Sequence, residues 1–183
     1  MGDALRRLFL SIGIGLGLAS GQVDPSLIAR VAVARGAAAT DALVVSARVD
    51  NAFAPGALEL IEAGTRVTVR FTAKAEAAGG GELTAEETRS LWYDLRTGRY
   101  DVAYGEGKIA ALVDPQAART LASELSSLAL GRADSLISGA RVIVRAEIGI
   151  MDARGAWHDA PVLWNYFGPR AVLTYDRGAG DVK

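Results

Sequence analysis

The chain has 183 residues, of which 50% are hydrophobic and 22% charged, and its formal net charge is −1 at pH 7. These proportions are typical of a folded globular protein, and a nearly neutral chain has no overall attraction for nucleic acid or anionic lipid. The lack of cysteine excludes disulfides, thiol nucleophiles and zinc–thiolate sites, and a single histidine, His158, excludes an imidazole cluster within one chain.

The N-terminal segment has the pattern of an export signal. Arg6 and Arg7 precede an apolar run over residues 8–19, and small residues follow it. This order predicts a secretory signal over residues 1–21, cleaved before Gln22. An uncleaved membrane anchor is the alternative, because the run extended to Val23 nearly reaches the ~20 apolar residues that span a bilayer. A buried N-terminal helix is a third possibility, which the glycines in the run disfavour.

Alternating apolar and polar residues predict strands over residues 28–35 and 42–50, followed by a short helix over 55–63. The clearest strand covers residues 65–75. One of its faces is apolar, and the other carries Arg, Thr and Lys side chains. Such a pattern indicates a half-buried antiparallel strand with one solvated face.

A glycine-rich acidic stretch over residues 76–87 predicts a loop or a hairpin turn. Two strands follow over 87–96 and 99–104, joined by a connection of hairpin length at Thr97-Gly98, and another is predicted over 108–113.

One long helix is predicted over residues 115–130. Asp114 suits its N-cap and Pro115 its first turn, and Gly131 suits its end. An apolar stripe at helical spacing supports it: Ala118, Leu121, Ala122, Leu125 and Leu128.

A long strand is predicted over 139–151, then a polar loop, and two short extended pieces before the end. The expected fold is therefore mostly β, an antiparallel β-sandwich with one long and one short helix. Residues 22–176 are expected to form a single β-rich domain, and 177–183 a disordered tail.

The order of these features resembles the DUF4390 family of bacterial membrane-associated or exported proteins. The matching pieces are LVVSARVDNAFAPGALELIEAGTRVTVRFTAKA, SLWYDLRTGRYDVAY, DPQAARTLASELSSL and ARVIVRAEIGI, which span roughly residues 42–151. The chain departs from the family after the long strand, where HDAPVLWNYF stands in place of an L-P-x-P-L step. The resemblance implies an envelope protein and supports fold and location more than an activity.

The residues do not assemble a recognisable reaction centre. His158 stands beside Asp159, but no G-x-S-x-G motif supplies a serine nucleophile, so a solvated loop histidine is the simpler interpretation. Glu82, Glu86 and Glu87 surround the glycine-rich stretch, where paired acids would suit glycoside chemistry and where acids more often keep a loop solvated. No catalytic residue, metal site or cofactor is predicted.

Aromatic residues give the best candidate for a binding site. They gather on two neighbouring strands and near the C-terminus. An aromatic groove for a ligand or partner is one interpretation, and filling of the sandwich core is the other. The candidate residues are Trp92, Tyr93, Tyr100, Tyr104, Trp164 and Tyr166, with Arg89, Arg96 and Arg99 as a polar rim.

Two functions follow from this pattern. The first is a non-enzymatic binding module, either periplasmic or anchored to the inner membrane and facing outward. Its partner would be an unidentified envelope protein or an apolar ligand, with no nucleic acid, and it would contact the membrane through residues 1–21 if they stay uncleaved. The second is a carboxylate-dependent hydrolase of envelope polymers, which requires two acids facing each other across a cleft.

Overall fold

The computed structural model describes residues 26–35, 41–164 and 168–175. The predicted signal segment 1–21, the predicted tail 177–183 and Tyr166 lie outside the described residues. The elements, in chain order, are β1 (Ser26–Arg35), β2 (Asp41–Asp50), α2 (Pro55–Glu62), β3 (Val67–Glu76), β4 (Glu82–Asp94), β5 (Arg99–Tyr104), β6 (Lys108–Leu112), α3 (Pro115–Ser123), β7 (Glu124–Arg132), the 3₁₀ turn η1 (Ala133–Ser135), β8 (Arg141–Met151), β9 (Trp157–Asp159), the 3₁₀ turn η2 (Pro161–Trp164) and β10 (Arg170–Thr174).

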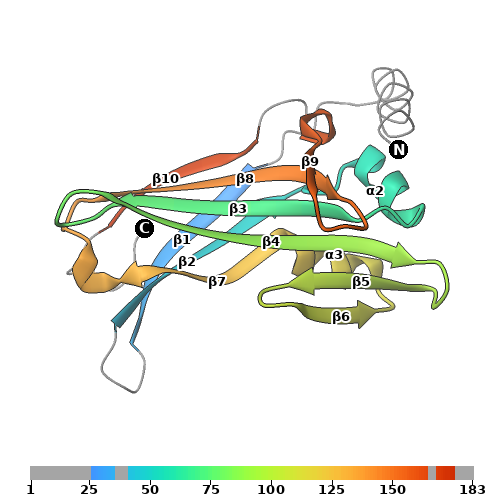
Figure 1. The fold of residues 1–183 in the computed structure, drawn as a ribbon, viewed down its shortest axis with the longest axis horizontal. Coiled ribbons are helices and arrows are strands. Elements are labelled where there is room, and N and C mark those ends of the chain that lie inside the picture. Colours follow the sequence, from blue (N-terminus) through green and yellow to red (C-terminus); the bar gives the residue numbers. More distant parts are fainter. Residues whose placement is uncertain (1–25, 36–40, 165–167, 176–183) are drawn as a thin grey trace.

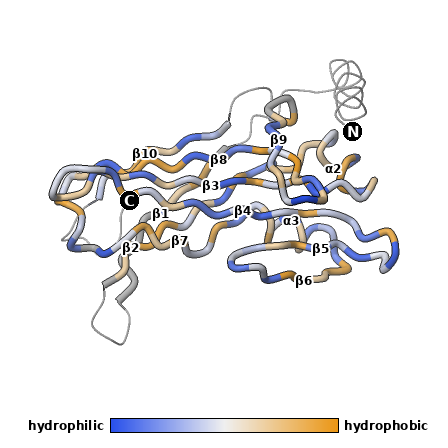
Figure 2. The backbone as a smooth tube through the Cα atoms, viewed as in Figure 1, coloured by the Kyte–Doolittle hydropathy of each residue, from blue (hydrophilic) through white to orange (hydrophobic). Residues whose placement is uncertain are grey.

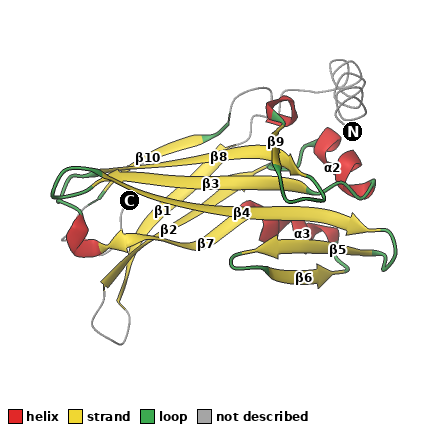
Figure 3. Ribbon diagram, viewed as in Figure 1, coloured by secondary structure: helices red, strands yellow, loops and turns green. Residues whose placement is uncertain are grey.

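The described strands form two sheets, and every strand pair is antiparallel (Figure 1). The larger sheet has the order β10-β8-β3-β4-β5-β6, with β9 pairing to the last residues of β8. The smaller sheet has the order β1-β2-β7 and crosses one face of the larger sheet. The two described α-helices, α2 and α3, lie in the half of the fold that contains β5 and β6 (Figure 3).

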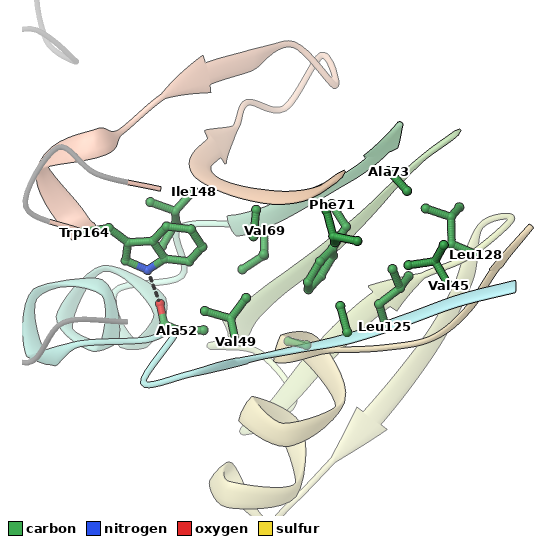
Figure 4. Close-up of a cluster of buried hydrophobic side chains, with 14 of the residues drawn as sticks. Val45, Val49, Ala52, Val69, Phe71, Ala73, Leu125, Leu128, Ile148 and Trp164 are labelled. Carbon is green, nitrogen blue, oxygen red and sulfur yellow. Dashed lines mark hydrogen bonds between the residues drawn. The ribbon is translucent and has the colours of Figure 1, made fainter. Parts of the chain in front are cut away.

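The hydrophobic core fills the space between the two sheets (Figure 4). Val69 and Phe71 of β3 are fully buried, and so are Val45 of β2 and Leu125 of β7. Figure 2 shows hydrophilic and hydrophobic segments alternating along the long strands. We call the face of the larger sheet that meets this core its inner face, and the opposite one its outer face. The predicted alternation in 65–75 is confirmed, because every second residue from Val67 to Ala75 is buried.

The predicted mostly β, antiparallel fold is confirmed, and the short helix is observed at Pro55–Glu62. The predicted loop over 76–87 is too long. A tight turn, in which the Ala77 amide donates to the Gly81 carbonyl, is enough to reverse the chain, and β4 already begins at Glu82. The alternating residues from Glu82 onward pair with β3, so the acidic stretch is strand rather than loop.

The predicted long helix over 115–130 is wrong in its second half. The helix ends at Ser123, and residues from Glu124 onward form β7, paired with β2. Asp114 does cap its start, accepting hydrogen bonds from the amides of Gln116 and Ala117 at 3.0 and 3.2 Å.

A buried arginine satisfies the end of this helix. The Leu121 carbonyl accepts a hydrogen bond from Nη1 of Arg89 at 3.1 Å, where a longer helix would supply an amide four residues on. The Ser123 hydroxyl donates to the Thr120 carbonyl at 3.2 Å. Arg89 is 4% exposed, and its Nε donates to Glu87 at 2.9 Å. Side chains therefore supply the hydrogen bonds that the last carbonyls of the helix need, and the chain can continue as a strand.

This arrangement predicts the effect of changing the ion pair. Arg89→Met leaves the half-buried Glu87 carboxylate and the Leu121 carbonyl without their partner, and we expect a loss of about 3–5 kcal/mol in the free energy of unfolding. The double variant Glu87→Leu/Arg89→Met removes both charges, and we expect it to recover most of that loss. Urea denaturation followed by circular dichroism measures both. A double variant no more stable than Arg89→Met would contradict the assignment.

Candidate functional site

The predicted aromatic residues that lie in the described part of the chain do not form one groove. Tyr93 and Tyr100 are cross-strand partners on the inner face, with ring centroids 5.0 Å apart, and Tyr104 shares that face. All three pack partly buried against the core, while Trp92 alternates with Tyr93 and points to the outer face.

Trp164 lies within the core. It is 3% exposed, and its Nε1 donates to the Ala52 carbonyl at 2.8 Å (Figure 4). The predicted polar rim also divides, because Arg89 is buried whereas Arg96 and Arg99 are exposed at the β4–β5 turn. The five candidate aromatic residues that the structure describes thus occupy the inner face, the outer face and the core.

The outer face carries two stacked arginine–tryptophan pairs. The guanidinium carbon of Arg66 lies 4.1 Å from the ring centroid of Trp92, and that of Arg70 lies 4.4 Å from the ring of Trp157. Such cation–π contacts are favourable, more so when they are shielded from water. Thr68, between the two arginines on β3, is fully buried. We call Arg66, Arg70, Trp92 and Trp157 the Trp–Arg layer.

Charges and a glycine fix the position of Trp157. Arg70 also pairs with Glu147 of the adjacent strand, and Trp157 donates through its indole nitrogen to Asp159. A Cβ at Gly149 would lie 2.5 Å from the Trp157 ring and 2.7 Å from the His158 carbonyl oxygen. Only glycine therefore lets this ring lie against β8. Trp157 was not predicted. Period-two spacing placed Arg66 and Arg70 on the solvated face together with threonine and lysine side chains, but it indicated no partner for either arginine.

The acidic candidates are separated. Glu87 is on the inner face with Arg89, whereas Glu82 and Glu86 lie on the outer face about 13 Å apart along β4. Lys74 binds Glu82 and, as a hydrogen-bond donor, lowers the pKa of that carboxyl. A facing pair for glycoside chemistry needs a separation below about 10 Å, so these three acids do not supply one.

His158 lies in β9 and pairs with Ile150 of β8, so the predicted loop position for it is wrong. Its Nε2 lies 3.2 Å from Oδ2 of Asp152, and Asp152 also accepts hydrogen bonds from the amides of Ala156 and Arg154. The Ala156 amide, followed by His158, lowers the pKa of Asp152 from its ordinary value. Within the described part of the chain, no three His, Asp or Glu residues gather as a metal site.

The end strand of the larger sheet presents an apolar outer face. Ile109, Ala111 and Val113 alternate along and just after β6, and Ile109 and Val113 are 62% and 75% exposed. No described strand pairs with the free edge of β6. At the other end of the sheet, β10 instead presents Arg170, Val172 and Thr174.

A pocket of about 560 Å³ lies between the end of β2 and α3. Val49, Ala52 and Phe53 supply its apolar part. Its polar lining consists of Arg48, Asp50, Asn51, Gln116, Arg119, Thr120 and Ser123. The pocket was not predicted, because its residues come from two segments more than sixty positions apart.

The comparisons with known proteins found no relationship. No protein-family model matches the sequence, and neither a curated protein nor a solved structure matches the chain significantly. Among the described helices, none is both long and apolar enough to cross a membrane.

The tight contact at Gly149 makes the Trp–Arg layer testable. Gly149→Ala drives a methyl group into the Trp157 ring and into backbone that cannot move aside, so we expect a loss of about 1–3 kcal/mol in unfolding free energy and a changed Trp157 environment. Gly79→Ala is the matched control, because nothing lies within 4 Å of its added Cβ. Denaturation and tryptophan fluorescence measure both effects, and equal behaviour of the two variants would refute this packing.

Proposed function

We propose that this protein is a non-enzymatic binding module of the bacterial cell envelope that takes up an extended segment of a partner protein along β6. The proposal includes export through residues 1–21, location in the periplasm or at the inner membrane facing outward, and membership of the DUF4390 family. The export pattern of the sequence supports the location, and the free edge of β6 supports the mode of binding.

The main observation behind this proposal is the unpaired edge of β6. An end strand offers unpaired backbone N–H and C=O groups, to which a partner strand adds by completing the hydrogen-bond ladder. Proteins commonly block such edges with charge, and β10 carries Arg170 on its outer face. β6 is the end strand of the larger sheet (Figure 1). Its outer face has Ile109 and Ala111 instead, so a segment added there would gain both backbone hydrogen bonds and apolar contacts.

An extended segment fits this edge better than a second folded copy. β6 has only 5 residues, which is a short ladder, whereas a stable dimer needs about 800 Å² buried on each partner. A flexible segment reaches across the edge and onto Ile109 and Val113 without bringing two sheets together. Its expected chemistry is a strand with β-branched or aromatic residues at alternate positions.

The edge is tested by site-specific photocrosslinking in cells. A photoreactive residue at position 109 is expected to give a discrete adduct with one envelope protein. The control is position 137, where Ile137 is 54% exposed away from β6, and we expect no adduct there. A peptide of the crosslinked segment should then slow amide hydrogen exchange in Lys108–Leu112, and Ile109→Lys should abolish that protection.

Three results would overturn this mode of binding. They are equal adducts at both positions, unchanged exchange in β6 with bound peptide, or a crosslink only between two copies of this chain.

The proposed location predicts the mass of the native protein. In the envelope fraction we expect a chain that begins at Gln22 if the signal is cleaved, or an intact Met1 chain that behaves as a membrane protein if it is an anchor. Intact mass and N-terminal sequencing distinguish these forms. An intact chain found only in the cytosolic fraction would contradict export in either form.

A further inference from the structure

Arg119 is the least satisfied charged residue of the pocket between β2 and α3. Its Nε is buried and has no hydrogen-bond partner, and the guanidinium makes no ion pair with any described residue. Folded proteins seldom leave a buried charged donor without an acceptor, because such a group has lost its water and gained nothing in return. The residue as a whole is partly exposed, so a molecule in the pocket has access to it.

The charges lining the pocket leave Arg119 uncompensated. Asp50 is the one acid among the lining residues, and it is already paired with Arg48 through an Nε–Oδ1 contact of 2.9 Å. The lining therefore carries two positive charges and one negative charge.

One face of α3 turns only polar residues to this space. Gln116, Thr120 and Ser123 lie at helical spacing with Arg119, whereas Ala118 and Ala122 on the opposite side are fully buried in the core. These side chains supply hydrogen-bond groups around the arginine. Val49 and Phe53 add an apolar surface, against which the apolar part of a ligand can pack.

We infer that this pocket binds a small organic oxyanion, a carboxylate or phosphate monoester with a compact apolar body, whose charged group pairs with the guanidinium of Arg119. A planar guanidinium binds such groups through two parallel hydrogen bonds. The size of the pocket suits a small molecule, since ligand sites generally measure about 300–1,000 Å³. This site is separate from the edge of β6 and does not depend on the proposed partner.

The full chain is titrated with phenyl phosphate and benzoate, and with benzyl alcohol as the neutral probe, while amide NMR shifts are recorded. We expect at least one anion to shift amides at Val49–Phe53 and Gln116–Ser123, with affinity falling as salt rises, and no such shifts from the alcohol. Arg119→Gln, which removes the charge, should weaken binding by about tenfold or more. Arg119→Lys keeps a charge without the planar fork and should retain part of the affinity.

Arg154→Gln is the control, because it removes an exposed arginine in the β8–β9 turn and should leave the affinity unchanged. The amide spectrum of each variant shows that it is folded before its affinity is compared. If Arg119→Gln fails to fold, the comparison is made with Arg119→Lys.

The inference is overturned if neither anion shifts the pocket amides, if benzyl alcohol binds as well as the anions, or if folded Arg119 variants bind like the unaltered chain. Equal weakening in Arg154→Gln would likewise show that net charge, not this pocket, attracts the probes.

Discussion

The position of β3 between β8 and β4 is the constraint on which the structure depends. Its inner face is apolar from Val67 to Ala75 and packs against the smaller sheet, while the buried Arg89–Glu87 ion pair of β4 lies beside Val69 and Phe71 on the same face. The outer face of β3 carries Thr68 and Arg70, and Arg66 directly precedes it. The two arginines anchor the Trp–Arg layer. A shift of one residue in its pairing would exchange these two faces and bury the arginines.

The strands were predictable because period-two alternation indicates both that a segment is a strand and which of its faces is buried. The prediction of the long helix was wrong because its second half has an apolar spacing that also fits a helix. Leu125 and Leu128 continue a helical stripe from Leu121, yet they are also both buried from β7, where Ser126 and Ser127 lie between them at a break in the register with β2. An interruption of the ladder thus produces a spacing of three residues, which from sequence alone looks helical. Nothing near residue 123 signals the stop, since the group that completes the helix end is Arg89, on another strand.

For the candidate sites too, the sequence predicted which strand a residue lies on but not which residues it contacts. Aromatic residues on a predicted hairpin were correctly placed on neighbouring strands, but alternation puts Trp92 and Tyr93 on opposite faces, so they cannot line one groove. The pairing of Trp157 with Arg70 requires a chain reversal after β8 and a glycine at position 149. The orphaned Nε of Arg119 is likewise invisible in sequence, because an absent partner is a property of the packed surroundings.

The two proposed sites share one continuous segment, residues 108–123, in which Asp114 joins β6 to α3 by capping the helix, and the end of β2 completes the pocket. Coupling between them would require α3 to have two positions on the sheet. Ala118 and Ala122 are fully buried, and such short side chains hold the helix backbone close to its neighbours. Arg89 binds the last turn through Leu121, while Asp114 fixes the first. Because the helix is held at both ends and along its buried side, we expect an anion at Arg119 to leave the edge of β6 unchanged. On this argument the two proposed sites would bind their ligands independently of each other.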